Sequence, residues 1–564
     1  MDLQNFPEVV FKLEEFCARR QEGLDPIAAL YPARRKQHSL FSNLLTDAEM
    51  ESLRPYLFGA AQPRIFNLVE GHWKAPRSGM FTPMFCPADR RQQLFSTATS
   101  NFEDVEDAVA AADRYWKSLA WASEVFSYRK HVVKNFSRLM DYFSEQCLHD
   151  IRQQIPKTRL EAQKDFFEAK RAADLLEGSV EAAIRGELAA PMLENHTYWR
   201  NAYLPAGPSA ILTPMNFIWG IPGIHLVGAY LAGVPFVFKG HPFAGLTNTT
   251  MLKMLLAAGA DPKQIHKLEG FGSDIASLAA DPRITVVAVT GSSETAKKMR
   301  AARGLNRLRF EGGGCNWAFV DDGFDREDLQ KIAARLTYSV LGFGAHKCTS
   351  LHGVTASPEV LGQLLPLINQ EMATWAVTDP RASEEVKVVS PLMVHKAQTL
   401  LDLVAAAREC PGVEVLRPGG RAEGSYGMQS EACKPVLLKI QKTSTVRIDW
   451  DGKGIVAVPL ATTEFFMPIL VGMEMQFDDF LRFSLFENPH DLAVAVWTRD
   501  DKKLQLGRRT LGGMLKENDG TDSAMEWEEF GSSGIGDSGN MGVGEVTATF
   551  AIYCRRQKGR HVVF

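Results

Sequence analysis

One cysteine stands in a setting that suits nucleophilic chemistry. Cys348 follows a glycine-containing run, residues 342–347, and has Lys347 as its immediate neighbour. Such a turn can hold a thiol open to a substrate, and a cationic neighbour favours the thiolate, which is the attacking form of cysteine. Most lone cysteines are inert small hydrophobic residues, so the assignment needs support from other residues.

Two further residues could assist such a nucleophile. Glu311 precedes three glycines, residues 312–314, which leave its carboxylate mobile and let the backbone pass close to a ligand. A carboxylate in a partly apolar cleft has a raised pKa and can act as a general base. Asn216 follows a short apolar segment, and its amide could donate to a developing oxyanion. A solvated loop glutamate and a turn asparagine are the commoner roles of these residue types.

A third group of residues suits an anionic cofactor. Lys239 ends an apolar segment, where a cation could meet a hydroxyl or phosphate group. Gly291 and Ser292 lie between an expected strand and an expected helix, so backbone N–H groups at the helix start offer an anion site. Neither strand end carries G-x-G-x-x-G, and the ordinary dinucleotide fingerprint is therefore missing.

The elements that must position these residues alternate between strands and helices. We expect strands at 209–213, 234–238 and 284–289, with helices at 246–258 and 294–303. This rhythm predicts an α/β fold with a parallel, doubly wound sheet. A second α/β rhythm runs from residue 316 to about 498. Helical patterns also occupy 129–152, 160–186 and a segment capped by Ser100 or Asn101, and 546–564 alternates like an exposed strand.

Composition excludes several classes of protein. The 564 residues need two or three domains, and the net charge of -4 makes nucleic acid a poor partner. The eight cysteines show neither C-x-x-C nor zinc-like spacing, which predicts reduced thiols in a cytoplasmic protein without a metal site. The first 15 residues lack the features of a signal peptide. Residues 201–238 carry no charge, but their prolines and glycines argue against a membrane span.

Taken together and in order, six segments resemble the aldehyde dehydrogenase superfamily. They are residues 213–217, 238–239, 289–292, 311–316, 347–348 and 463–468, with a looser match at 530–531 and 538–539. The similarity covers about residues 60 to 560. Residues 345–348, the helix over 160–178 and the long N-terminal region look most like the 1-pyrroline-5-carboxylate dehydrogenase branch.

The resemblance implies a fold and a division into domains. We expect a Rossmann-type dinucleotide-binding domain (61–190 and 206–309), an α/β catalytic domain (310–520) and a small β oligomerisation flap (191–205 and 540–564). Residues 1–60 would form a polar helical extension that packs on the outside. The family also implies a homodimer or homotetramer.

The resemblance further implies roles for individual residues. Cys348 attacks the aldehyde, Asn216 and the Cys348 N–H hold the oxyanion, and Glu311 activates the water that hydrolyses the thioester. The hydride acceptor is NAD or NADP. Its binding residues would be Thr213, Pro214, Lys239 at the adenosine ribose, Gly291 and Ser292 at the pyrophosphate, and Glu464 at the nicotinamide ribose with Phe466 beside it.

Some positions depart from the family pattern. Pro242 replaces an acid that many NAD-using members have, which removes a bar to NADP, so either cofactor is allowed. His346 stands where Gln is commoner, and we expect a packed neutral side chain. Glu528 and Glu529 lie near the substrate-anchoring loop and would disfavour an anionic substrate.

Three alternative functions remain open from the sequence. A CoA-acylating semialdehyde dehydrogenase is disfavoured because such enzymes commonly lack the general base, and Glu311 is present. A non-catalytic binding protein on the same fold is disfavoured by the joint presence of Cys348, Glu311 and Asn216. A cysteine hydrolase would not explain Lys239 and the residues from Glu464 to Phe466.

Overall fold

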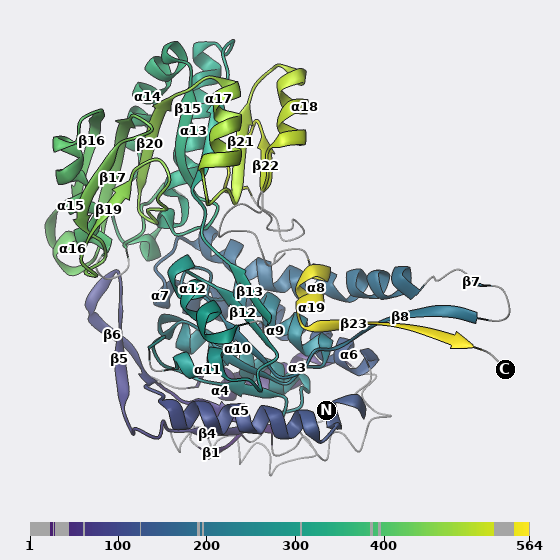
Figure 1. Cartoon of the computed structure of the whole chain (residues 1–564). Helices are drawn as coiled ribbons and strands as arrows, with labels where there is room; N and C mark the ends of the chain where they lie inside the picture. Colours follow the sequence, from purple (N-terminus) through teal and green to yellow (C-terminus); the bar gives the residue numbers. More distant parts are fainter. Residues whose placement is uncertain are drawn as a thin grey trace.

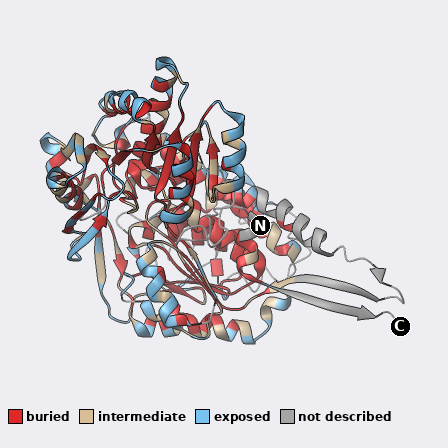
Figure 2. Cartoon of the chain, turned by 45° about the horizontal axis from the view of Figure 1, so that its top comes forward, coloured by how far each residue is buried: buried red, intermediate tan, exposed pale blue. Residues whose placement is uncertain are grey.

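The computed structural model shows two sheet-based bodies with a smaller arm (Figure 1). It describes residues 23–25, 27–28, 44–59, 63–123, 126–188, 192–193, 197–273, 275–304, 307–383, 387–392, 396–523 and 546–562. The buried residues concentrate in and around the two large sheets (Figure 2). Among the described helices, none is long and apolar enough to cross a membrane.

The first body is built on an eight-stranded sheet. Its spatial order is β1 (Gly23–Leu24), β4 (His72–Lys74), β3 (Asn67–Val69), β11 (Ile265–Lys267), β10 (Phe236–Lys239), β9 (Ser209–Leu212), β12 (Val286–Thr290) and β13 (Arg307–Glu311). The last five strands in this order are parallel. The chain runs outward from β9 to β11 on one side and from β12 to β13 on the other. The sheet is therefore doubly wound, with its switch point between β9 and β12.

Helices cover both faces of this sheet. One face packs against α5 (Phe102–Lys117) and α11 (Ala276–Ala280), with α12 (Ser293–Arg303) beside them. The other packs against α6 (Phe126–Tyr142), α8 (Arg159–Leu188), α9 (Gly220–Ala232) and α10 (Gly245–Ala258). Helix α9 is buried almost all round, as expected for an uncharged helix inside a large core. The uncharged stretch of the sequence is thus core rather than membrane span.

The second body is built on a seven-stranded sheet. Its order is β16 (Val413–Arg421), β17 (Cys433–Ile440), β20 (Ile469–Glu474), β15 (Leu351–Ala356), β14 (Asn316–Val320), β21 (Ala493–Trp497) and β22 (Met514–Glu517). Only the β16–β17 pair is antiparallel among its described strand pairs. Helices α13 (Arg326–Leu341) and α14 (Pro358–Met372) cover one face. Helices α15 (Lys396–Glu409) and α17 (Phe477–Arg482) cover the other.

Smaller elements join or extend the two bodies. The hairpin of β5 (Phe81–Cys86) and β6 (Asp89–Ala98) pairs with β2 (Arg64–Ile65), and its Arg90 bonds to Glu431 in the second body. A short hairpin, β18 (Thr445–Asp449) and β19 (Ile455–Pro459), packs on α15. Strands β8 (Thr197–Pro205) and β23 (Cys554–Val562) pair antiparallel and form the arm of Figure 1, with β7 (Met192–Leu193) on the outer edge.

Most expected elements are confirmed with shifted ends, and Asn101 caps α5 with the reciprocal bond from Asp104. The expected helix over 129–152 is two helices, α6 and α7 (Ser144–Gln154), which meet at Phe143. The expected strand over 546–564 is wrong in its first half, because α19 (Val546–Ile552) precedes β23. This helix lies against α9, where its Thr549 reaches to within 3.0 Å of where a side chain on Gly228 would begin.

The N-terminal segment also differs from expectation where it is described. Helices α3 (Asp47–Ser52) and α4 (Arg54–Phe58) are not merely external and polar, because their Met50, Tyr56 and Leu57 belong to the core of the first body. Met50, Leu53 and Leu57 stand at i, i+3 and i+7 in a segment of polar composition, and this apolar spacing explains why the segment packs into the core.

Candidate functional site

Cys348 lies between the two bodies of the fold, just before β15. The preceding turn holds three consecutive residues in the left-handed region, Phe343 (φ 57°), Gly344 (φ 62°) and Ala345 (φ 61°). Non-glycine residues rarely adopt this conformation, and runs of it are found where surrounding contacts impose it. One such contact is buried, from the Phe343 N–H to a carboxylate oxygen of Glu161 at 2.6 Å. The turn is therefore a rigid support for the residue that follows.

The electrostatics of Cys348 keep its sulfur protonated in the ligand-free protein. The side chain is half-buried, and burial raises its pKa to about 12, with the charge of Glu311 as the next contribution. Lys347 acts in the opposite direction, but its Nζ points away and donates to the backbone oxygen of Asp522. Lys347 lowers the pKa of Cys348, as expected, but desolvation outweighs it, so the net shift of this pKa is upward. Attack by this thiol requires a group that takes its proton.

Glu311 lies at the edge of the first sheet, and its charge acts on the sulfur of Cys348. It is the last residue of β13, opposite Thr290 of β12, and its side chain is 3% exposed. Its backbone oxygen accepts the Gly291 N–H at 3.0 Å. The strand pairing fixes the backbone of Glu311, whereas the expected mobility of its carboxylate stays a prediction. Its charge raises the pKa of Cys348.

Asn216 approaches the same turn from the first body. Its Nδ2 donates to the backbone oxygen of His346 at 2.7 Å, two residues before Cys348. Its own backbone oxygen accepts Lys157 Nζ at 2.7 Å, and Lys157 is paired with buried Asp165 at 2.8 Å. An amide nitrogen has two hydrogens, so one N–H beyond the His346 bond is available to a bound oxyanion. The buried ion pair fixes the loop that presents this amide.

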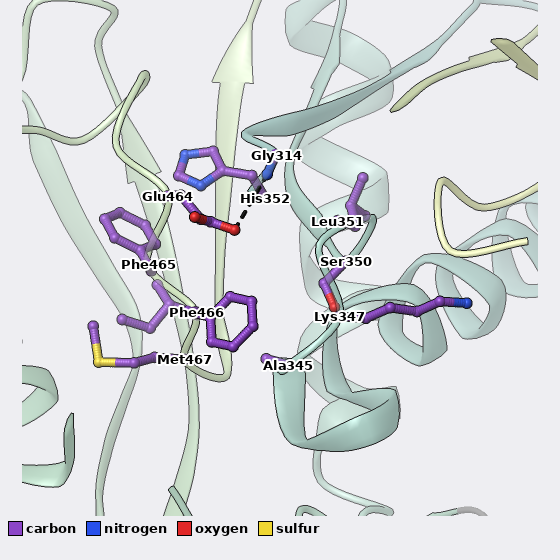
Figure 3. Close-up of a pocket in the computed structure, with 11 residues that line it drawn as sticks. Gly314, Ala345, Lys347, Ser350, Leu351, His352, Glu464, Phe465, Phe466 and Met467 are labelled. Atoms are coloured by element: carbon purple, nitrogen blue, oxygen red, sulfur yellow. Dashed lines mark hydrogen bonds between the residues drawn. The ribbon is translucent and has the colours of Figure 1, made fainter. Parts of the chain in front are cut away.

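Glu464 lies in the loop between β19 and β20, and its charge acts on Cys348. Its Oε1 accepts the Gly314 N–H at 3.2 Å, and burial raises the pKa of its carboxyl to about 7 (Figure 3). A side chain on Gly313 would collide with this carboxylate, and one on Gly314 would come within 2.6 Å of the Cys348 carbonyl oxygen. Close packing thus explains two of the three glycines after Glu311, Gly313 and Gly314. The adjoining cavity has a volume of about 20 Å³, room for about one water molecule.

Phe466 and His346 form an aromatic contact beside this cavity. Their ring centres lie 5.3 Å apart, and Phe466 has a left-handed backbone with φ 54°. His346 is buried, and burial lowers its pKa to about 3. The expected packed, neutral histidine is confirmed.

The carboxyl edge of the first sheet offers a place for a dinucleotide. Thr213 and Pro214 follow β9, and Gly291 and Ser292 follow β12, so the switch point of the sheet lies between the two pairs. Ser292 caps the 11-residue helix α12, and nothing lies within 4 Å of where a side chain on Gly291 would begin. The hydroxyl of Thr213 is buried without a hydrogen-bond partner in the described chain.

These observations fit a nucleotide diphosphate, which needs open space, backbone donors and hydroxyls at the carboxyl ends of strands. Lys239 ends β10, adjacent to β9, and its side chain is largely buried. All the residues expected for the cofactor therefore lie at this edge or, for Glu464 and Phe466, on the facing loop of the second body.

Three residues that position the site were not selected from the sequence, although Asn316 ends the matched segment 311–316. Asn316 donates its Nδ2 to the backbone oxygens of Cys348 and Ser350, at 2.8 Å each, and its Oδ1 accepts the Ala493 N–H. Its amide holds the nucleophile strand against β21. Lys157 and Asp165 are part of an ordinary helical pattern and only tertiary contact shows their role. Glu528 and Glu529 lie outside the described residues, and in the described ranges no cluster of acids, cysteines and histidines could hold a metal ion.

Comparison with known proteins gives one consistent result. Residues 73–557 match the model of the aldehyde dehydrogenase family. N-succinylglutamate 5-semialdehyde dehydrogenase of Yersinia pestis is 26% identical over 322 residues, which are 56% of this chain and 57% of that protein. The chain thus aligns with little more than half the length of the first relatives that it matches.

Solved structures agree in fold at low identity. A 1-pyrroline-5-carboxylate dehydrogenase variant of Thermus thermophilus superimposes with a TM-score of 0.77 at 18% identity, over 92% of this chain and 96% of that one. A methylmalonate-semialdehyde dehydrogenase from Sinorhizobium meliloti, so described and solved with NAD, gives a TM-score of 0.76 at 17% identity, over 89% and 99%.

Proposed function

Because the chain belongs to the aldehyde dehydrogenase family, we propose that it oxidises an aldehyde to a carboxylic acid with NAD or NADP as the hydride acceptor. The observation that carries this proposal is the meeting of one protonated thiol with three groups. Glu311 and Glu464 act electrostatically on Cys348, and the Asn216 amide bonds to the turn that presents it. A thiol, a base, an oxyanion donor and a cofactor-facing acid are what thioester-forming oxidation needs.

The first half of the reaction uses Cys348 and Asn216. The Cys348 thiol gives up its proton to solvent through water, and the sulfur attacks the aldehyde carbon. The carbonyl oxygen becomes an oxyanion, which accepts hydrogen bonds from Asn216 Nδ2 and the Cys348 N–H. A bound nicotinamide dinucleotide supplies the acceptor for the hydride that then leaves this carbon. The product on the protein is a thioester of Cys348.

The second half uses Glu311. Its carboxylate takes a proton from water, and the water oxygen attacks the thioester carbonyl carbon. The C–S bond breaks, the acid leaves and the Cys348 sulfur is protonated again. Glu311 is held in the sheet next to Gly291, so the base and the proposed pyrophosphate residues share one rigid strand pair.

The cofactor would be held by residues of both bodies. Thr213, Pro214 and Lys239 would bind the adenosine half, Gly291 and Ser292 the pyrophosphate, and Glu464 with Phe466 the nicotinamide ribose. Pro242 is buried at the start of the short helix that follows β10, and it offers no charge against a 2′-phosphate. We therefore propose that NADP is accepted as well as NAD.

The substrate is proposed as an aldehyde without commitment to its tail. The relatives named above act on semialdehydes, whereas Glu528 and Glu529 in the sequence argue against an anionic tail. We further propose a homodimer or homotetramer assembled through β8 and β23, and a cytoplasmic location. The seven free cysteines among the described residues support a reducing compartment.

The test is reduction of NAD and NADP by the purified chain against aliphatic, aromatic and acid-bearing aldehydes. We expect turnover with at least one class, no product from Cys348→Ala, and a single burst of reduced cofactor from Glu311→Gln. Added CoA should not be needed for release of the acid. Full steady-state turnover by Glu311→Gln would remove Glu311 from the mechanism.

A further inference from the structure

The hairpin of β18 and β19 belongs to the second body, but its tip touches the first. Lys453, in the tip between Asp449 and Ile455, lies with its Nζ 3.5 Å from a carboxylate oxygen of Glu294 in α12. The base of the hairpin is anchored through Val446, Ile448 and Val458, which are buried in the second core. The hairpin therefore extends from the second body to α12, the helix whose first residues lie at the proposed diphosphate site.

The tip is held in one conformation by contacts with α15. Asp451 has a left-handed backbone with φ 57°, and its N–H donates to the hydroxyl of Thr399 at 3.1 Å. Its carboxylate pairs with Lys396 at 2.9 Å, and both side chains are largely buried. A conformation that L residues rarely adopt persists where contacts impose it. These contacts fix the place from which Lys453 extends.

The partner of Lys453 is a weak one. The side chains of Lys453 and Glu294 are 63% and 57% exposed, and Glu294 is also paired with Lys298, one helical turn on, at 2.8 Å. Exposed pairs contribute little and exchange readily. Glu294 would keep a cation beside it if Lys453 turned to another anion. Ser292, two residues before Glu294, caps the helix whose N–H groups form the proposed pyrophosphate site.

The same tip is connected to the other end of the dinucleotide site. Lys396, which holds Asp451, also donates to the backbone oxygen of Phe465 at 3.5 Å, the residue after Glu464. The tip is thus linked through Lys396 to the loop that carries the residue proposed for the nicotinamide ribose. A diphosphate joins the two halves of the cofactor and carries the negative charge that an ammonium group would neutralise.

We propose that Lys453 binds the diphosphate of the dinucleotide, so that the β18–β19 hairpin lines the dinucleotide site from the second body. In this arrangement the N–H groups at the start of α12 and the Lys453 ammonium would both contact the diphosphate. The inference rests on the proposed function for the existence of the cofactor, and on the hairpin geometry for the role of Lys453.

The test is binding of NAD, ADP and adenosine to the full chain by calorimetry, without turnover. Lys453→Ala should raise the Kd for NAD and for ADP about fivefold, as for one exposed charge contact of about 1 kcal/mol. The Kd for adenosine, which has no phosphate, should not change. Lys453→Arg should restore affinity. The matched control is Lys442→Ala, which removes an exposed lysine paired with Glu487 on the same body.

A second variant separates ligand binding from a purely structural latch between the bodies. Glu294→Gln removes the ion pair but keeps Lys453, so it should bind NAD and ADP at least as tightly as the wild type. Equal weakening by Glu294→Gln and Lys453→Ala, or equal weakening toward adenosine, would assign the pair a structural role and overturn the inference. Unchanged affinity in Lys453→Ala would do the same. A wild-type chain that binds no dinucleotide would overturn the proposed function itself.

Discussion

Replacing Glu311 with Gln has two opposite consequences for the reactivity of Cys348. In the ligand-free protein the thiol should be alkylated faster, because the negative charge of Glu311 raises the pKa of Cys348 and the amide does not. In steady-state catalysis the same change should slow turnover, because deacylation loses its base. The two measurements together separate the electrostatic influence of Glu311 from its chemical role.

The size of the effect follows from the pKa of Cys348, which burial raises to about 12. At pH 8 about one sulfur in 10⁴ is then ionised, and alkylation is correspondingly slow. Burial is the larger cause and remains in the variant, so the pKa should fall but stay above that of a free thiol. An interaction of about 1 kcal/mol with Glu311 corresponds to about a fivefold rise in the thiolate fraction.

The assay is the rate of iodoacetamide labelling of the Cys348 peptide between pH 7 and 10, followed by mass spectrometry. Cys410, the other half-buried cysteine in the described chain, provides an internal reference that should not change. Glu311→Asp, which keeps the charge, should label like the wild type. Labelling of Cys348 in Glu311→Gln that is equal to or slower than that of the wild type would refute the electrostatic account.

Three further changes test other parts of the site. Asn216→Ala should slow the first turnover about 10²- to 10³-fold in stopped-flow measurements while cofactor affinity holds, and a loss under fivefold would remove it from the oxyanion site. Dinucleotide affinity should rise with pH through about 7, because the raised pKa of Glu464 leaves this carboxyl protonated below that pH and ionised above it. Glu464→Gln should flatten this pH profile of affinity. A profile that the substitution leaves unaltered would exclude Glu464 as the titrating group. Ala345→Gly, at φ 61°, should raise the free energy of unfolding by about 1 kcal/mol in chemical denaturation. Ala333→Gly in α13 should lower it by a similar amount, and a loss in both would show that the turn is unstrained.

The sequence predicted the parts of the fold that local chemistry decides. The strand at 284–289 is a run of β-branched residues closed by Thr290–Ser292, and the structure places β12 there with Ser292 as the helix cap. The segment 546–552 also alternates polar and apolar residues, yet it is helical, because packing against α9 overrides a short local pattern. The residue pattern of a short segment alone therefore does not decide whether it forms a strand or a helix.

The same division applies to the candidate site. Cys348, Glu311 and Asn216 could be selected because their residue types, order and glycine neighbours are visible in the chain. The protonation of Cys348 could not be predicted, because it depends on burial by segments far apart in sequence. The effect of this burial on the pKa outweighs that of the adjacent Lys347. The Lys157–Asp165 pair that holds the Asn216 loop, and the Lys453 hairpin tip, are likewise products of tertiary contact.

The central claim is that Cys348 carries the substrate as a thioester, and the direct test is to trap that species. Glu311→Gln should be mixed with an accepted aldehyde and NAD or NADP, quenched in acid and digested. The account predicts that the Cys348 peptide gains the mass of the aldehyde less two hydrogens, and that no gain occurs without the dinucleotide. An acyl group on another residue, or turnover with Cys348 never modified, would contradict it.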